Sequence, residues 1–294
     1  MNVLITGANG FLGKYVTNKF ETEGHIVYGI SRSCYPKVYA IDVTNAHSIN
    51  RIVSEKSIDH IVHLAGKPIV YDCEKNPVDA FMTNGIGTAS VLDAARLNQV
   101  KKVVSVETDK VYGIQDVLPT DETATLNPGS PYEFSKALAS QFADFYRSYY
   151  GLNVISVRPA NLYGFGDFST SRLVPSALNN LKQGKGIRLY SSAFEMERDF
   201  VHVEDVANAI YLLTISETKY NTYNLSTNEP MKIKDIADRI VRTLNLNIPH
   251  DVVEKNEFNE IPKQQIDGTR FVQEFNFKYR SFEEGILQTW EKMK

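Results

Sequence analysis

The first thirty residues contain the feature that most constrains the fold. Residues 3–6 form a short apolar run with β-branched side chains, and a glycine-rich turn over residues 7–13 follows it directly. An amphipathic segment occupies residues 11–23, and residues 26–30 form a second apolar run. A strand, a glycine turn, a helix and a second strand in this order predict a βαβ unit.

The same alternation continues through the first half of the chain. Further apolar runs predict strands, and amphipathic segments predict helices between them. The expected helices cover residues 48–55, 83–97 and 132–150, and the expected strands cover residues 58–64, 102–106 and 154–157. Such alternation predicts an α/β fold with a doubly wound parallel sheet of the Rossmann type, covered by helices on both faces.

The alternation becomes irregular beyond Pro159, where the chain is more polar and is interrupted by glycines. We therefore expect residues 1–165 to form the Rossmann domain and residues 166–294 to form a smaller C-terminal α/β lobe. The segment 198–226 is expected to pack back on the first domain. A chain of 294 residues is long enough for one large or two modest domains.

Composition excludes several classes of protein. The net charge is −3 and the basic residues are dispersed, so we expect no nucleic-acid partner. Two cysteines and six histidines show no metal-ligand spacing, so we expect no metal. The longest apolar runs fall short of the roughly 20 residues of a membrane span, and the chain starts with a strand, not a signal peptide. We expect a cytoplasmic protein with no membrane contact.

The glycine turn stands where a Rossmann fold binds the pyrophosphate of a dinucleotide. Glycines allow a tight turn and close backbone approach, and the helix that follows offers free N–H groups and the positive end of its dipole. A glycine triplet alone is weak evidence, but at the first βα turn it is strong. The residues expected to contact the dinucleotide here are Gly7, Asn9, Gly10, Phe11, Leu12 and Gly13.

The end of the second expected strand bears on which dinucleotide binds. NAD sites usually place an acidic residue there for the ribose 2′-hydroxyl, whereas an arginine accommodates the 2′-phosphate of NADP. This strand ends in Ser31 and Arg32, so NADP is the preferred cofactor and NAD the alternative; Arg32 as a solvated surface residue is the other interpretation. Further along, Asp42 and Val43 are expected beside the adenine. Leu64, Ala65 and Gly66 are expected along the pyrophosphate and ribose.

Two later segments carry acid–base chemistry. Tyr132 and Lys136 are four residues apart, so a helix places them on one face, where an ammonium group can lower the pKa of a phenol. The triplet Thr108, Asp109 and Lys110 follows an expected buried strand. The plainer interpretations are a helix-surface pair and an exposed loop ion pair, the latter worth little energetically.

Together these segments resemble the extended short-chain dehydrogenase/reductase family, whose members act on nucleotide-linked sugars. The resemblance covers about the first 215 residues. It rests on the glycine turn, His63-Leu64-Ala65, Thr83-Asn84 with Gly87-Thr88, Tyr132-x-x-x-Lys136, and Arg158-Pro159-Ala160-Asn161 with Tyr163-Gly164. Within the family the chain looks most like the 4,6-dehydratases, CDP-glucose 4,6-dehydratase in particular, through the Thr108 triplet and residues 67–77 and 166–175. It is shorter than typical members.

The resemblance implies a role for each site residue. Tyr132 would remove the proton from the sugar O4 while hydride leaves C4, Lys136 would assist it, and Thr108 would orient the same oxygen. Asp109 would act as the acid and Lys110 as the base in the loss of water across C5 and C6. The C-terminal lobe would bind a nucleotide-diphosphate sugar, with Asn161, Arg172 and Arg198 as its contacts.

Other functions stay open on the sequence. One is a 4-epimerase or 4-ketoreductase, in which Asp109 and Lys110 only shape the pocket. Another is an inactive dinucleotide-binding regulatory protein, which would have no use for Tyr132. The family also implies a homodimer through two helices. An apolar stripe on the second of them fits either that interface or core burial: Phe134, Leu138, Phe142, Phe145 and Tyr149.

Overall fold

The computed structural model describes residues 1–33, 36–254 and 261–294. Seven parallel strands form the central sheet, in the order β3-β2-β1-β4-β5-β6-β11 for the part of the chain described. The strands are β1 (Asn2–Thr6), β2 (Ile26–Ser31), β3 (Val38–Ala40), β4 (His60–His63), β5 (Lys102–Val106), β6 (Val154–Pro159) and β11 (Thr222–Leu225). The predicted doubly wound α/β fold is confirmed.

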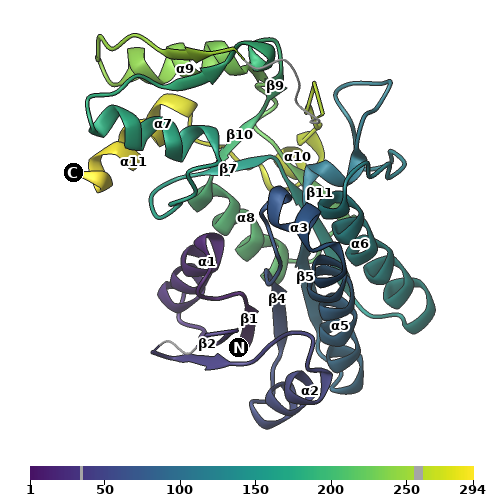
Figure 1. The fold of residues 1–294 in the computed structure, drawn as a ribbon. Coiled ribbons are helices and arrows are strands. Elements are labelled where there is room, and N and C mark those ends of the chain that lie inside the picture. The colour runs from purple at the N-terminus through teal and green to yellow at the C-terminus, as the bar shows by residue number, and fades with distance from the viewer. Residues whose placement is uncertain (34–35, 255–260) are drawn as a thin grey trace.

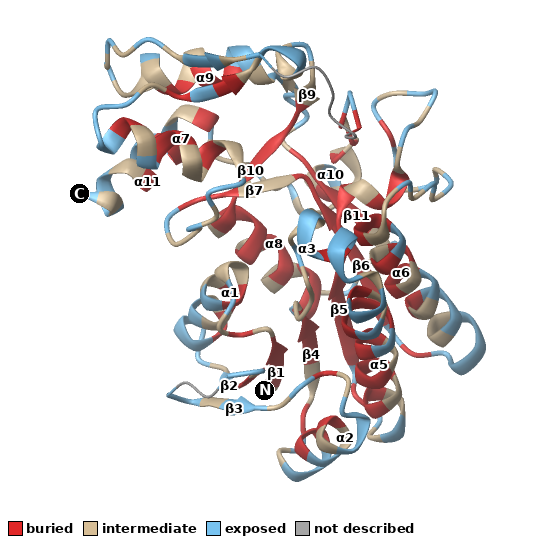
Figure 2. Ribbon diagram, in the orientation of Figure 1, coloured by how far each residue is buried: buried red, intermediate tan, exposed pale blue. Residues whose placement is uncertain are grey.

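Helices cover both faces of this sheet (Figure 1). On one face α1 (Phe11–Thr22) packs against α8 (Val203–Ile215). On the other face lie α2 (Ala46–Glu55), α5 (Gly87–Leu97) and α6 (Pro131–Tyr150). Each face has its own apolar cluster, and Figure 2 shows the buried strands between the half-exposed helices. Burial on both faces explains why the strands are continuous apolar runs.

Helix α6 owes its sharp limits to local sequence. The Ser130 hydroxyl accepts from the amide of Glu133, whose carboxylate accepts from the amide of Ser130, a complete capping box. Pro131 takes the first helical position, and the helix ends at Gly151, whose φ is 68°. These signals place Tyr132 in the first turn and Lys136 one turn later.

A second, smaller body lies above the carboxyl ends of the strands (Figure 1). It contains α7 (Leu173–Lys182), α9 (Ile233–Thr243) and α11 (Phe282–Met293), which share an apolar core of their own. Its two-stranded sheets pair β7 (Asn161–Tyr163) with β10 (Phe200–His202), β8 (Arg188–Tyr190) with β13 (Asp251–Val253), and β9 (Glu197–Arg198) with β12 (Met231–Lys232).

The chain returns to the central sheet after entering this lobe. Helix α8 packs on α1, β11 pairs with β6, and α10 (Thr269–Phe275) lies beside β11. Ile266 and Phe271 are buried in the core of the sheet although they follow the lobe's α9 in sequence. The two bodies are therefore interleaved along the chain.

The structure departs from the expected elements in two places. The helix expected over residues 83–97 begins as a wider π-helical segment, Phe81–Ile86, before α5, and short helices α3 (Val70–Lys75) and α4 (Pro77–Ala80) precede it. Strand β11 was not expected, because four residues are too short for a recognisable periodicity. No helix in the described residues has the length and apolar character that a membrane span requires.

Candidate active site

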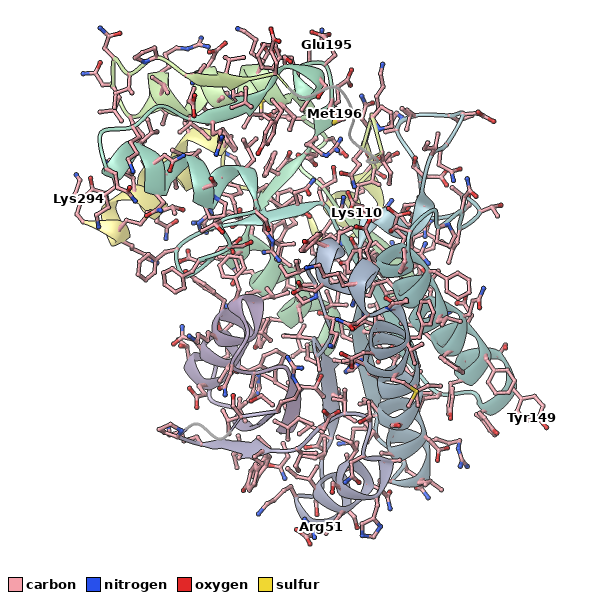
Figure 3. The ribbon with its side chains drawn as sticks, in the orientation of Figure 1. Arg51, Lys110, Tyr149, Glu195, Met196 and Lys294 are labelled. Atoms are coloured by element: carbon pink, nitrogen blue, oxygen red, sulfur yellow. The ribbon has the colours of Figure 1, made fainter. Side chains whose placement is uncertain are left out.

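A cleft of about 1260 Å³ runs between the carboxyl ends of the strands and the C-terminal lobe. Every residue that the sequence nominated for cofactor binding, substrate binding or catalysis lies on its walls. Figure 3 shows Lys110 at the junction of the two bodies. The crevice at the carboxyl ends of the strands is where open α/β sheets bind their ligands.

The glycine turn forms one end of the cleft. Gly7 has φ 68°, and a Cβ there would lie 2.9 Å from the backbone nitrogen of Ala65. A Cβ on Gly13 would lie 2.1 Å from the carbonyl oxygen of Gly7, so only glycine fits. Helix α1 starts at Phe11 with no side-chain cap from the described residues, which leaves its first amides available to an anion.

The cleft wall around the end of β2 combines an arginine, Arg32, with an aspartate, Asp42. Asn9 Nδ2 donates to Ser31 Oγ at 2.9 Å, which joins the turn to the end of β2. Asp42 accepts from the backbone and hydroxyl of Thr44, and these bonds, with the nearby positive charge of Arg32, lower the pKa of its carboxyl. The lowered pKa keeps Asp42 ionised, and its negative charge interacts with the positive charge of Arg32. Strand β2 itself has no acidic residue at its end.

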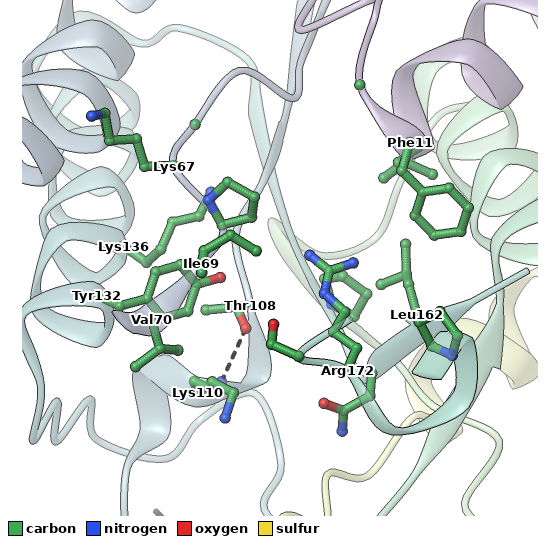
Figure 4. A pocket seen from close by; sticks show the side chains of 18 of the residues that line it. Phe11, Lys67, Ile69, Val70, Thr108, Lys110, Tyr132, Lys136, Leu162 and Arg172 are labelled. Carbon is green, nitrogen blue, oxygen red and sulfur yellow. Dashed lines mark hydrogen bonds between the residues drawn. The ribbon is translucent and has the colours of Figure 1, made fainter. Parts of the chain in front are cut away.

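Thr108, Tyr132 and Lys136 share one wall of the cleft (Figure 4). Burial raises the pKa of the Tyr132 phenol to about 12, and its hydrogen bond with Thr108 opposes that rise. Lys136 donates from Nζ to the carbonyl oxygen of Val106 at 2.9 Å, and burial lowers its pKa to about 8.

The prediction that Lys136 lowers the Tyr132 pKa is therefore not met in this structure. Desolvation of the phenol outweighs the Thr108 hydrogen bond and the positive charge of Arg172, and the Lys136 ammonium is directed at a backbone carbonyl. The two side chains still lie on one helix face at the foot of the cleft, as predicted.

Asp109 opens the short 3₁₀ turn Asp109–Tyr112 that follows β5. Its side chain is buried, and burial raises the pKa of its carboxyl, while Lys110 and Thr108 oppose the rise. Thr108 donates from its hydroxyl to Asp109 Oδ1 at 3.1 Å and caps the amide of Lys110 at 3.4 Å. A raised pKa favours the protonated carboxyl that the role of an acid requires.

The three expected substrate contacts line the cleft but are held differently. Asn161, at the start of β7, donates to the carbonyl oxygen of Asp199 at 3.1 Å. Arg172 is bound to Asp167 at 3.0 Å, and Arg198 is buried and donates to the carbonyls of Glu197 and Pro262. The two guanidinium groups thus have protein partners and do not form a free fork.

Two buried histidines, His63 and His202, have structural contacts. His63 hydrogen-bonds with the hydroxyls of Thr6 and Thr88, and burial lowers its pKa to about 3. His202 accepts from the amide of Glu204 at the start of α8, and its pKa is also lowered to about 3 by burial. Within the described ranges no group of histidine, cysteine and acidic side chains could hold a metal.

Sequence reasoning missed two groups behind the site. Glu107, directly before Thr108, is buried and paired with Arg158 at 2.9 Å. Gln264 lies 155 positions after Asp109 and donates from Nε2 to Asp109 Oδ2 at 3.3 Å. Glu107 could have been found, because an acidic residue directly after an apolar strand is visible in the sequence. Nothing in the sequence linked Gln264 to the site.

The sheet, the glycine turn, and the Tyr132 and Lys136 wall define a Rossmann-fold dinucleotide enzyme of the extended short-chain type. The family profile described as NAD dependent epimerase/dehydratase matches residues 3–226, and the chain belongs to that family. The predicted family resemblance is thereby confirmed.

Two curated relatives are 4,6-dehydratases. The dTDP-glucose 4,6-dehydratase of Shigella flexneri is 27% identical over 335 residues, covering 99% of this chain and 92% of that protein. A trifunctional UDP-glucose 4,6-dehydratase of Arabidopsis thaliana is 25% identical over 99% of this chain, which spans only 46% of that longer protein.

Two solved structures illustrate the similarity of fold. The UDP-glucose 4-epimerase of Thermotoga maritima, solved with UDP-glucose, superposes with a TM-score of 0.92 at 24% identity, covering 100% of this chain and 98% of that one. The dTDP-glucose 4,6-dehydratase of Bacillus anthracis, in complex with NAD, gives a TM-score of 0.85 at 25% identity, covering 99% and 96%.

Proposed function

We propose that this protein is a nucleotide-sugar 4,6-dehydratase. One observation carries the proposal: a buried acid, Asp109, and an amine, Lys110, follow Thr108 on the cleft wall that also holds Tyr132. An oxidation alone needs only the tyrosine and its helpers. A neighbouring acid and base supply the two proton transfers of an elimination.

The residues present fit a dinucleotide. The cradle made by Gly7 and Gly13 is closed to any side chain, and the uncapped start of α1 offers amide donors to a pyrophosphate. Ser31 and Arg32 also line the cleft, and we propose that Arg32 favours NADP over NAD. The family description and the NAD complex of the Bacillus relative support NAD as the alternative. A dinucleotide held there would supply a hydride acceptor for C4 and a hydride donor for C6.

Tyr132 acts first, by taking the proton of the sugar O4 hydroxyl as C4 becomes a carbonyl. Thr108, which hydrogen-bonds with Tyr132, orients that oxygen. Lys136 donates to the Val106 carbonyl, and its proposed part is to oppose, through its positive charge, the rise that burial causes in the pKa of Tyr132. A bound cation beside the Tyr132 phenol would also lower the pKa of that phenol.

Elimination follows because the C4 carbonyl acidifies the proton on C5. Lys110 accepts that proton, and the C–H electron pair becomes the C5–C6 double bond. Asp109 gives its proton to O6, which leaves as water with the electrons of the C6–O6 bond. The raised pKa of Asp109 keeps its proton in place until that step.

A 4-epimerase is the second candidate, because the Thermotoga epimerase is so similar in fold. In that case Asp109 and Lys110 would only shape the pocket, and a sugar would change configuration without changing mass. A 4-ketoreductase would consume reduced cofactor stoichiometrically, and an inactive regulatory protein would bind the dinucleotide without turnover.

The test is incubation with a panel of nucleotide hexoses, read by mass spectrometry for the loss of one water. Asp109→Asn and Lys110→Met should slow water loss at least about 100-fold while C4 oxidation persists. Arg51→Met, on the exposed side of α2, is the matched control. Inversion of one sugar with no change of mass would show an epimerase, and equal loss of both steps would refute the roles of Asp109 and Lys110.

We also propose a homodimer formed through α5 and α6. Phe134, Phe145 and Tyr149 on α6 are exposed, so much of the predicted stripe is not core. Phe145 and Tyr149 stack with ring centroids 5.4 Å apart, and Figure 3 shows Tyr149 far from Lys110. Exposed aromatic clusters on paired helices are characteristic of protein interfaces.

A further inference from the structure

We infer that Gln264, supplied by a segment of the chain remote from the Rossmann motifs, is a positioning residue for the acid of the elimination. Its side-chain amide donates to Asp109, which lines the cleft, whereas Gln264 is not among the cleft-lining residues. The inference rests on the proposed dehydratase function and deepens it. It assigns Gln264 no contact with the sugar or the cofactor.

The Asp109 carboxyl is held at both of its oxygens. Oδ1 accepts from the Thr108 hydroxyl at 3.1 Å, and Oδ2 accepts from Gln264 Nε2 at 3.3 Å. Asp109 is 7% exposed and Gln264 is 6% exposed, so water competes little for these bonds. Two fixed partners set the plane of the carboxyl, and an acid must present its proton in a defined direction.

The backbone around Gln264 is anchored to both bodies. Gln264 donates its amide to the carbonyl of Glu197, and Glu197 donates to the carbonyl of Pro262. On the other side Thr120 donates to the carbonyl of Gln265 and accepts from the amide of Asp267. The segment therefore bridges β9 in the lobe and the Thr120 loop, which fixes where the amide of Gln264 stands.

The amide fits the change of charge that Asp109 undergoes. Once the carboxyl has protonated O6 it is a buried carboxylate, and the Nε2–H donor of Gln264 stabilises that charge. The Oε1 atom of Gln264 is buried and has no hydrogen-bond partner among the described residues. A buried polar atom left unpaired is costly, so packing alone does not explain a glutamine here.

Several charged or titratable groups near Asp109 also affect the pKa of its carboxyl. Lys110 follows it in the turn, Arg198 and Asp199 face it from β9 and the residue beyond, and Tyr132 faces it from α6. Arg198 and Lys110 favour the carboxylate, and Asp199 opposes it. Gln264, like Thr108, is a neutral donor to Asp109, so removing it changes no net charge.

The first test measures Asp109 itself, by ¹³C NMR titration of the full-length protein labelled at aspartate, with Asp109→Asn assigning the signal. In Gln264→Met, which keeps the length of the side chain but loses the donor, the pKa of Asp109 should rise by about one unit. Gln265→Met is the matched control, because Gln265 bonds Glu197 instead. An unchanged or lower pKa in Gln264→Met would overturn the inference.

The second test separates elimination from oxidation in a single turnover. Gln264→Met should slow water loss about tenfold and leave C4 oxidation within about twofold. Equal slowing of both steps would mean a structural role only, and no slowing would also overturn the inference. Gln264→Glu is a second variant in case Gln264→Met does not fold: two adjoining carboxyls share a proton, so the alkaline limb of water loss should move to higher pH.

The two tests distinguish the inference from the proposed function. If wild-type protein removes water from no sugar, the dehydratase proposal fails, while the NMR titration still reports whether Gln264 sets the pKa of Asp109. If wild-type protein dehydrates a sugar and neither Gln264 variant differs from it, Gln264 has no part in the reaction.

Discussion

Arg158 donates from Nε to the carboxylate of Glu107 at 2.9 Å, directly beneath the strand end that carries Thr108. The side chains are 6% and 0% exposed. Ser140 also donates to Glu107, and Arg158 donates to the Tyr112 hydroxyl at 3.0 Å. This buried network joins β5, β6 and α6, the elements that carry the catalytic wall.

Removing one partner of that pair leaves an uncompensated buried charge. Arg158→Met should therefore lower the free energy of unfolding by about 3–5 kcal/mol, measured by urea denaturation. Arg188→Met is the control, because its bond to Asp251 is 3.8 Å long and more than half exposed, and should cost at most about 1 kcal/mol. Similar losses in the two variants would contradict the assignment of the buried network.

Burial of the Lys136 ammonium lowers the free energy of unfolding, whereas the Arg158–Glu107 pair is expected to raise it. Burial lowers its pKa to about 8 from the ordinary 10.5, so between these values the unfolded chain binds more protons than the folded protein. The free energy of unfolding therefore rises with pH across that window, and the cost of burying the ammonium is complete below about pH 8. Lys136→Met should abolish activity yet raise the free energy of unfolding at pH 7.

The gain expected for Lys136→Met is about 1–3 kcal/mol, because the side chain keeps some contact with solvent. It should shrink as the pH rises from 8 to 10.5. Urea denaturation at pH 7 and pH 10 measures both values, with the exposed Lys185→Met as the control. A gain that is independent of pH would show that the lysine is not desolvated as described.

The proposed cofactor preference depends on Arg32. Arg32→Ala should weaken NADP binding about 10- to 100-fold and NAD binding less than about threefold, since only NADP offers a 2′-phosphate. Fluorescence titration with each dinucleotide measures this, with Arg51→Ala as the control. Asp42→Asn should strengthen NADP binding, because Asp42 places a negative charge near Arg32. Equal loss for both dinucleotides in Arg32→Ala would remove the argument for NADP.

The proposed dimer depends on the exposed aromatic face of α6. Light scattering at micromolar concentration should give twice the mass of one chain for the wild-type protein. Phe145→Ser should shift it towards the monomer, because Phe145 is 48% exposed and contacts three neighbouring tyrosines. Phe168→Ser is the control, since Phe168 is 81% exposed in the lobe. A wild-type monomer would refute the dimer.

Local patterns in the sequence were sufficient for the fold and much of the site. The four-residue spacing of Tyr132 and Lys136 was enough to place them on one helix face, and the structure adds the capping box that fixes where this helix begins. The glycine turn follows from steric limits at Gly7 and Gly13, which act within a few residues.

The remaining site features depend on contacts between distant segments. The pairing of Arg172 with Asp167 and of Gln264 with Asp109 depends on how loops of the lobe are placed, which no periodicity encodes. The pKa of Tyr132 was predicted in the wrong direction for this structure because depth of burial outweighs the charge of a neighbour. Burial depth is a property of the assembled fold.

The repeated return of the chain to the central sheet has a consequence for how such a protein can change. Strand β11, helix α8 and Phe271 belong to the sheet's core, although residues of the lobe precede and follow them. The lobe therefore cannot be replaced as one continuous segment of sequence, because a deletion that removes the whole lobe also removes part of the sheet. New substrates must be reached by substitutions along the cleft wall, one side chain at a time.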